Sequence, residues 1–214
     1  MKEIEHVQRR PSPAVTPQAL AWDGTHLWMG SRDLRRVYRI DVPGWKVVEE
    51  IEAPGIPWAA VSLGKEIGLT IGEDPEDNRY LYRYAPNDGF TRRFACPEFT
   101  GSYLSFDGEH LYLSQWYKGR ILKLDQSGQV VRTIQLHVEI SGHTFVDGMI
   151  YVLHGTEKDG ESWAITRVDP RELEPKAHDL AWVPFASRSL TFDGKQFWSN
   201  HRAGNEIISF SLPG

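Results

Sequence analysis

A set of polar and aromatic residues with chemically useful side chains falls at two fixed places beside a hairpin that the sequence repeats. They lie just before the first apolar run of the hairpin or just after its second. These candidate ligand-binding residues are Gln18, Arg32, Trp58, Glu73, Tyr103, Gln115, Trp116, His143, His154, Arg188, His201 and Arg202. Guanidinium groups bind carboxylates and phosphates through forked hydrogen bonds, and aromatic rings cover the apolar part of a ligand. If the fold brings these residues together, they predict a site for a small polar or anionic molecule or for a protein segment.

Metal and cofactor chemistry have less support in the sequence. His143, His154 and His201 could converge on a metal ion, but no His-x-x-x-His spacing on a helix fixes that geometry. The acidic run of residues 73–77 lacks the glycine and the ligand spacing of a calcium loop. Gly-x-Ser-x-Gly and glycine-rich phosphate-loop motifs are absent from the sequence. We therefore expect no catalytic residues, no metal and no cofactor, with a ligand-binding role favoured over an enzymatic one.

The hairpin that positions these residues is an apolar run, an Asp-Gly turn and a second apolar run. It is written as LAWDGTHLWM at residues 20–29 and recurs at residues 104–113, 145–152 and 190–199, with a degenerate copy at 61–69. Asp-Gly between apolar runs is a strong hairpin signal, because glycine accepts the positive φ that a tight turn needs. Strand-like alternation continues after each copy, as at residues 36–41 and 46–51.

The spacing of the hairpins predicts the architecture. The turn glycines, which are Gly24, Gly64, Gly108, Gly148 and Gly194, are 40, 44, 40 and 46 residues apart, and the two chain ends together supply 44 more. Four short antiparallel strands in each unit of this length are typical of propeller blades. A β-sandwich would explain neither the period nor the split unit.

We therefore predict an all-β fold, a five-bladed β-propeller with four antiparallel strands per blade, in one domain of residues 1–214. The expected blades are about 17–52, 56–96, 100–137, 140–183 and 186–214. The last unit lacks a fourth strand, so residues 3–9 are expected to close the ring as its outer strand, which removes exposed edges. Aromatic residues at equivalent places in the second strands could form a ligand platform, but packing between blades is the stronger expectation. These residues are Trp28, Tyr112, Tyr151 and Trp198.

Composition limits the partners. A net charge of −5 and the lack of a basic block argue against nucleic acid. The single cysteine, Cys96, allows no intramolecular disulfide. No stretch of about 18 apolar residues occurs and the N-terminus has no apolar signal region. We expect a cytoplasmic protein without membrane or nucleic-acid partners.

Two stretches resemble the five-bladed glutaminyl cyclotransferases of plants and bacteria. Residues 16–28 with 34–41 resemble the first blade of that family, and residues 106–116 with 120–125 resemble its middle blade. The chain resembles the propellers of streptogramin lyases and NHL-type repeats more loosely, and it lacks the Trp-Phe-Thr-Glu motif of the lyases. The resemblance implies the propeller fold and, as an alternative function, a cyclotransferase-like or lyase-type enzyme.

The sequence departs from the cyclotransferase pattern at its functional positions. The family's first blade carries a glutamate in Tyr-Glu-Ser-Thr-Gly that is thought to move the proton, and Met29 stands at that position here. Residues 101–104 replace a stretch with two carboxylates, and Arg202 replaces a lysine. A thioether cannot act as a general acid or base. Catalysis in this chain would need a substitute, for which Glu73, His143 and His154 are the candidates.

Overall fold

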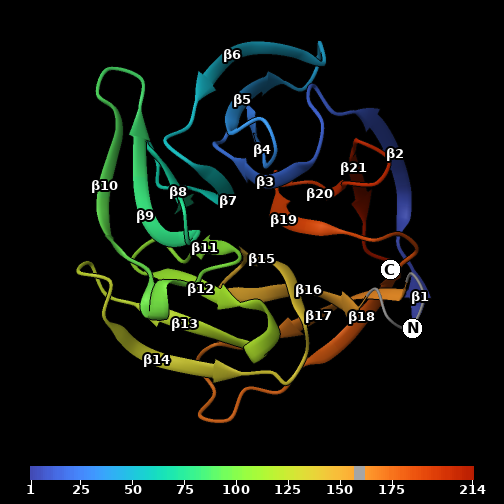
Figure 1. Ribbon diagram of the computed structural model, residues 1–214. Helices are drawn as coiled ribbons and strands as arrows, with labels where there is room; N and C mark the ends of the chain where they lie inside the picture. Colours follow the sequence, from blue (N-terminus) through green and yellow to red (C-terminus); the bar gives the residue numbers. More distant parts are fainter. Residues whose placement is uncertain (157–161) are drawn as a thin grey trace.

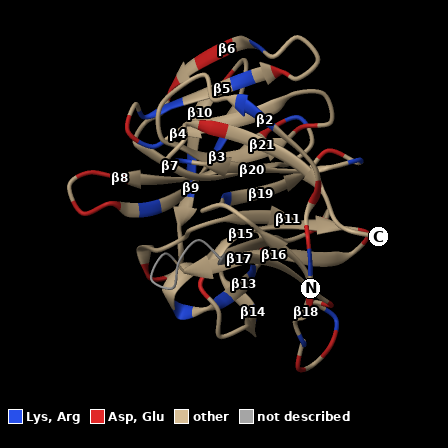
Figure 2. Ribbon diagram, turned by 90° about the vertical axis from the view of Figure 1, so that its right-hand side faces the viewer, with Lys and Arg blue, Asp and Glu red and all other residues tan. Residues whose placement is uncertain are grey.

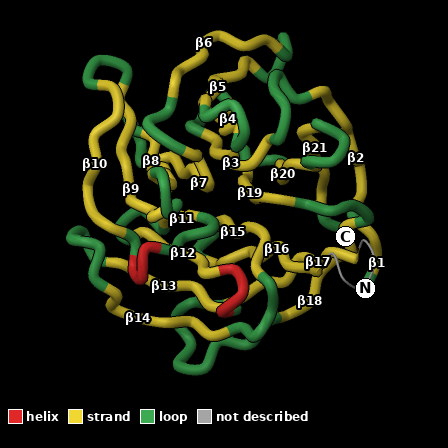
Figure 3. The backbone as a smooth tube through the Cα atoms, viewed as in Figure 1, coloured by secondary structure: helices red, strands yellow, loops and turns green. Residues whose placement is uncertain are grey.

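The computed structural model describes residues 1–156 and 162–214, whose strands form five sheets set around a central axis (Figure 1). The innermost strands, β3, β7, β11, β15 and β19, contact one another in sequence around the axis. The chain is therefore a five-bladed β-propeller, as the repeat predicts. Figure 3 shows only two short helical turns beside the strands in the described part of the chain, η1 (Pro97–Phe99) and η2 (Trp116–Lys118).

The first three blades follow the chain from the axis outward. Blade 1 is β3 (Pro17–Trp22), β4 (Leu27–Ser31), β5 (Arg36–Asp41) and β6 (Lys46–Glu52). Blade 2 is β7 (Ile56–Ser62), β8 (Ile67–Glu73), β9 (Asn78–Ala85) and β10 (Gly89–Ala95). Blade 3 is β11 (Leu104–Phe106), β12 (Leu111–Gln115), β13 (Arg120–Leu124) and β14 (Val130–Gln135). All neighbouring strands within these blades are antiparallel.

The N-terminus joins the last two blades. Blade 4 is β15 (Ile140–Val146), β16 (Met149–Thr156), β17 (Ser162–Val168) and β18 (His178–Val183), and β1 (Lys2–Glu3) adds a short parallel fifth strand. Blade 5 is β19 (Arg188–Phe192), β20 (Phe197–His201), β21 (Glu206–Ser211) and β2 (Glu5–Pro11). Antiparallel pairing of β2 with β21 confirms the predicted closure, whereas the pairing of β1 with β18 was not foreseen. Between the two pairings, Ile4 is buried and its amide donates to Trp182.

The repeated Asp-Gly turn works through its aspartate. Oδ1 of Asp23 accepts the amides of Thr25 and His26, and Oδ2 accepts the indole N–H of Trp28 at 2.7 Å. The same pattern joins Asp193 to Trp198. The turn carboxylate therefore satisfies both the loop amides and the polar atom of the aromatic residue behind it, which explains why the two recur together.

Apolar side chains fill each junction between adjacent blades. Trp28 packs between blades 1 and 2, and Tyr112 packs between blades 3 and 4. Tyr151 packs between blades 4 and 5, and Trp198 packs between blades 5 and 1. The aromatic stripe is thus core packing, as expected. Figure 2 shows that Lys, Arg, Asp and Glu lie mainly on loops and outer strands, with the acidic β8–β9 loop projecting on the left. Among the described residues, no helix is long and apolar enough to cross a membrane.

Candidate functional site

A cavity of about 150 Å³ lies where the starts of the inner strands meet, and every blade contributes to it. It is lined by Gln18, Trp58, Arg79, Ser102, Tyr103, Trp116, Ser141, Arg188 and Arg202. The structure therefore brings together six of the residues that the sequence singles out for ligand binding. Those six are Gln18, Trp58, Tyr103, Trp116, Arg188 and Arg202.

Irregular pairing in the inner strands supplies several of these side chains. The pairing of β3 with β4 skips Gln18, that of β7 with β8 skips Trp58, and that of β15 with β16 skips Ser141. In blade 3, Ser114 faces two residues, because its carbonyl accepts the amide of Ser102 and its amide donates to the carbonyl of Tyr103. A β-bulge of this kind leaves a residue unpaired and redirects its side chain. The cavity is therefore built by the same backbone device in several blades.

Gln18 connects the inner strands of different blades beneath the cavity. It is only 2% exposed. Its Nε2 donates to the carbonyl of Trp58 at 3.2 Å and to the hydroxyl of Tyr103 at 3.3 Å, and its Oε1 accepts from Arg202 at 3.1 Å. All the polar atoms of the amide are thus engaged, which fixes its orientation and holds the guanidinium of Arg202 beside the cavity.

A stacked pair forms the blade 2 wall. The guanidinium of Arg79 lies 4.1 Å from the ring centroid of Trp58, and Asp77 accepts from the indole at 2.8 Å and from Arg79 at 3.2 Å. Arg79 also donates to the carbonyl of Gly101 at 2.8 Å. Gly72 makes this close approach possible, because a Cβ there would stand 1.7 Å from Oδ1 of Asp77 and 2.8 Å from Nε1 of Trp58. The wall is rigid, since cation–π stacking and shared hydrogen bonds act on the same groups.

Arg188 forms the opposite wall. It donates to the hydroxyl of Ser141 and to the carbonyl of Ser187, both at 3.3 Å, and lies 5.6 Å from the ring centroid of Trp163. The indole of Trp163 donates to the same hydroxyl of Ser141. A buried serine therefore ties the arginine and the tryptophan of neighbouring blades together.

His143 lies behind the cavity and is 1% exposed. Its Nε2 is 3.2 Å from the carbonyl of Tyr103 and its Nδ1 is 2.7 Å from the hydroxyl of Ser105. A carbonyl can only accept, so Nε2 carries the proton and the hydroxyl of Ser105 donates to Nδ1. Burial lowers the pKa of His143 to about 4, partly offset by the bond to Tyr103. The neutral imidazole supports the backbone of Tyr103, whose side chain faces the cavity.

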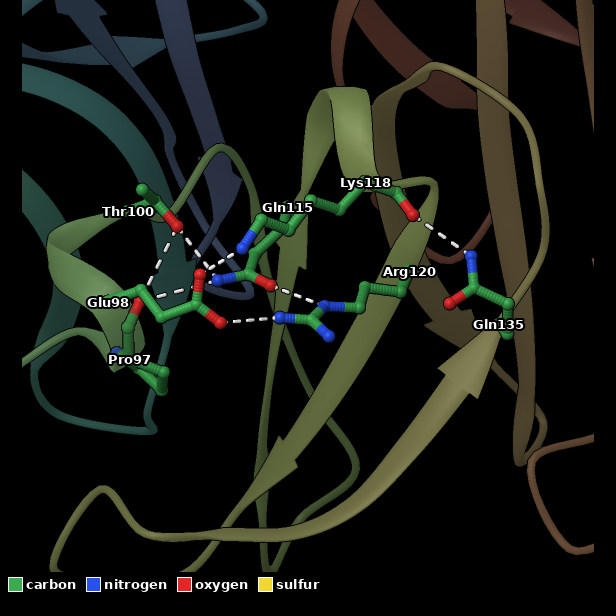
Figure 4. A network of polar contacts seen from close by, with 7 residues as sticks. All are labelled: Pro97, Glu98, Thr100, Gln115, Lys118, Arg120 and Gln135. Carbon is green, nitrogen blue, oxygen red and sulfur yellow. Dashed lines mark hydrogen bonds and ion pairs between the residues drawn. The ribbon is translucent and has the colours of Figure 1, made fainter.

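Gln115 belongs to a polar network beside the cavity (Figure 4). Its Nε2 donates to Thr100 at 2.8 Å and to the carbonyl of Pro97 at 3.3 Å, and its Oε1 accepts from Arg120 at 2.5 Å. Arg120 and Lys118 both bind Glu98. The network joins the two helical turns of blade 3, η1 and η2, so Gln115 acts on the loops around the cavity rather than on its lining.

The remaining candidate residues lie apart from the lining. Arg32 pairs with Asp33 at 2.9 Å. Glu73 accepts from the hydroxyl of Tyr82 at 2.5 Å and pairs with Arg92, and burial together with Glu73 raises the pKa of Tyr82 to about 12.

The two other histidines also lie within their own blades, and Nε2 of His154 is buried without a hydrogen-bond partner among the described residues. His154 lies in β16 opposite Ile140 and Ala164, and burial lowers its pKa. His201 binds Glu206 at 3.0 Å. The described residues include no group of three or more His, Cys, Asp or Glu placed to hold a metal ion.

Three lining residues were not foreseen from the sequence. Ser102 precedes β11, and Ser141 lies at the bulge of β15. A serine at either place has no sequence pattern that indicates a binding site. Arg79 is the second residue of β9, the third strand of blade 2. Its place two residues after the acidic run of residues 73–77 is the clue that the sequence offers.

The cavity is rich in hydrogen-bond donors and positive charge. Three guanidinium groups, of Arg79, Arg188 and Arg202, line it, and no Asp or Glu does so among the described residues. Aromatic side chains of Trp58, Tyr103 and Trp116 complete it. Such a set can hold a carboxylate or phosphate group by charge-assisted hydrogen bonds while covering an apolar portion.

Comparisons with known proteins address the fold. No protein-family model and no curated protein sequence matches this chain. A glutaminyl cyclase from Myxococcus xanthus superposes with a TM-score of 0.69 at 12% identity, covering 99% of this chain and 98% of that one. The PQQ-bound aldose sugar dehydrogenase from Streptomyces coelicolor gives 0.61 at 11% identity, covering 97% and 98%. A streptogramin B lyase gives 0.54 at 10% identity, covering 97% and 98%.

The resemblance to glutaminyl cyclotransferases therefore holds for the whole propeller. Identities of 10 to 12% show a shared fold and leave activity open.

Proposed function

We propose that this protein binds a small organic anion, a carboxylate in the first instance, in the cavity at the inner strand starts. The observation that carries the proposal is the convergence of Arg79, Arg188 and Arg202 on one cavity, beside the polar side chains of Gln18, Ser102 and Ser141. Loops and strand ends around a concave rim are where ligand sites of such folds lie.

The geometry supports a defined orientation for such a ligand. Gln18 holds Arg202, and Ser141 holds Arg188, so both guanidinium groups are positioned before a ligand arrives. Positioning in advance lowers the entropic cost of binding. The stacked Trp58 and Arg79 offer a flat wall for an apolar or planar portion. A volume of about 150 Å³ is below the range of drug-sized pockets and favours a ligand with few non-hydrogen atoms.

Binding without catalysis is favoured by where the acid–base candidates lie. Met29 is fully buried in the core with Leu20 and Trp198 and does not line the cavity. Glu73 is bound by Tyr82 and Arg92, and His143 is buried with both ring nitrogens engaged. None of the residues offered as a substitute acid or base is among the described lining residues. A general acid or base must reach the proton that it transfers, which supports a binding role.

Calorimetry with a panel of small carboxylates, phosphates and neutral sugars tests the proposal. We expect a carboxylate to bind and Arg202→Gln to weaken it about tenfold or more, because a charge-assisted hydrogen bond contributes about 1.5–3 kcal/mol. Arg171→Gln is the matched control, since Arg171 is exposed on the turn between β17 and β18 and pairs with Asp169. A panel without binding, or binding equally strong in Arg202→Gln, Arg188→Ala and Trp58→Ala, would place the function elsewhere.

An enzymatic role is the second candidate, and the superposition of the whole chain on a glutaminyl cyclase favours it. Release of ammonia from peptides with N-terminal glutamine measures this activity directly. Release that is abolished by Arg202→Gln and retained by Arg171→Gln would establish catalysis at the cavity. No release at high protein concentration would remove cyclisation.

A further inference from the structure

A second cavity opens beside the first at the junction of blades 2 and 3. Its volume is about 300 Å³, and it shares Arg79, Ser102 and Trp116 with the first cavity. The rest of its lining is Glu76, Asp77, Asn78, Glu98, Phe99, Thr100, Gln115 and Tyr117. The two cavities are therefore direct neighbours, with Arg79, Ser102 and Trp116 at their common boundary.

The second cavity differs from the first in that carboxylates line it. Three carboxylates, of Glu76, Asp77 and Glu98, line it together with a single described cation, Arg79. Asp77 and Glu98 are engaged by neighbouring basic groups, whereas Glu76 is exposed on the acidic β8–β9 loop (Figure 2). A ligand that lies across both cavities would meet guanidinium groups at one end and the exposed carboxylate of Glu76 at the other.

Three exposed aromatic rings line the second cavity. Phe99 is 48% exposed, Trp116 42% and Tyr117 69%. Trp116 and Tyr117 meet edge to face, with ring centroids 6.2 Å apart. Exposed aromatic rings beside carboxylates attract cationic groups through their faces.

The aromatic rings are held in place by the polar network of Figure 4. Glu98 and Phe99 take positive φ values of 57° and 56°, and Glu98 is fixed there by Lys118 and Arg120. Gln115 binds Thr100 and Arg120 and so connects the two turns that carry the rings. Such strained backbone persists only when surrounding contacts over-determine it, which indicates a preformed surface.

We infer that the two cavities form one site for the C-terminal end of a short peptide, with the carboxylate in the first cavity and a basic side chain in the second. The inference rests on the proposed anion binding in the first cavity. Because the two cavities share three lining residues, a short extended peptide, which advances about 3.3–3.6 Å per residue, is the kind of ligand that reaches from one into the other. Charge complementarity selects the occupant: Arg188 and Arg202 face the carboxylate, and Glu76 with Tyr117 faces the basic side chain.

Calorimetry with N-acetyl-arginyl-alanine and two altered ligands tests this site. We expect the peptide to bind about tenfold tighter than N-acetyl-alanine, because a cation–π contact and an exposed ion pair are added. Replacing arginine by its neutral isostere citrulline should remove most of that gain. Replacing the C-terminal carboxylate by an amide should weaken binding about tenfold or more.

Two variants test whether the tighter binding of the arginyl peptide arises in the second cavity. In Glu76→Gln and Tyr117→Ala, the preference for arginine over citrulline should fall at least about twofold, while N-acetyl-alanine binds as in the wild type. Glu174→Gln is the control, since Glu174 is exposed between β17 and β18, at the other end of the strands.

Each outcome has a distinct meaning. Binding of N-acetyl-alanine with no gain for the arginyl peptide, or a gain unchanged in both variants, overturns the peptide site and leaves anion binding intact. Binding of none of these carboxylates overturns both proposals.

Discussion

Replacing His143 by glutamine tests how the propeller supports its cavity. The buried ring donates from Nε2 to the carbonyl of Tyr103 and accepts at Nδ1 from Ser105, which is possible only for the neutral form. Protonation would place a second N–H against the hydroxyl of Ser105 in a site without solvent. The folded protein therefore resists protonation until the pH approaches 4, where burial has set the pKa of His143.

The sign of the pH effect follows from comparing the two states. In the unfolded chain the imidazole titrates near 6.5. Between that pH and about 4 the unfolded state binds a proton that the folded state does not, so stability falls as the pH falls through this window. A difference of about 2.5 pKa units corresponds to roughly 3 kcal/mol of unfolding free energy.

Urea unfolding of wild type and His143→Gln between pH 7.5 and 4 measures the effect. At pH 7.5 we expect the variant to be less stable by about 1–3 kcal/mol, because the amide of glutamine does not place its donor and its acceptor at the positions of the two ring nitrogens. As the pH falls to 4, the wild type should lose roughly 3 kcal/mol relative to the variant, so that the gap closes or reverses, since the other titrating groups are common to both proteins. A gap that stays constant with pH would refute the argument. An NMR titration that gives His143 a pKa near 6 would refute it independently.

Three further substitutions probe the core and the cavity wall. Gly72→Ala should displace Asp77 and weaken ligand binding several-fold in calorimetry, because the added methyl would stand 1.7 Å from Oδ1. Met29 is fully buried, so Met29→Glu should lower the unfolding free energy by about 3 kcal/mol or more. The control Met29→Leu should lower it by less than about 1.5 kcal/mol. Equal urea midpoints for the two variants would contradict this expectation. Asp193→Ala should cost about 1–3 kcal/mol in thermal unfolding by leaving the indole of Trp198 without its acceptor; an unchanged melting temperature would show that the turn aspartate is dispensable.

The architecture was predictable because one short motif carries several physical constraints at once. The carboxylate of Asp23 accepts hydrogen bonds from two loop amides and an indole, and Gly24 adopts a positive φ of 98°. The Asp-Gly pair recurs at the turn between the first two strands of the blades, and the spacing between its copies predicts five blades. The parallel pairing of β1 with β18 was not predictable, since a two-residue strand carries no periodicity.

The cavity was predictable only in part, because the bulges change which residues face the axis. In blade 1, Trp22 pairs with Leu27 beside the turn, and Ala19 lies three residues before Trp22. In blade 4, Val146 pairs with Met149, so His143 occupies the place of Ala19 and is buried between blades. Counting alone cannot reveal such a shift, since a one-residue change of register reverses the face of every side chain that follows.

The two ends of the central channel differ for the same structural reason. At the turn end, the inner strands finish in regular pairs, and large apolar residues gather around a cavity of about 160 Å³ that includes Trp22, Phe106, Phe145 and Phe192. At the other end, the bulges interrupt the pairing and direct polar side chains such as Gln18 toward the axis. Where the inner strands pair regularly, apolar side chains fill the end of the channel. Where the bulges interrupt the pairing, guanidinium and amide groups face the axis. Ligand recognition is therefore expected at the bulged end, and differences in ligand preference among propellers of this shape should follow from which residue each bulge exposes.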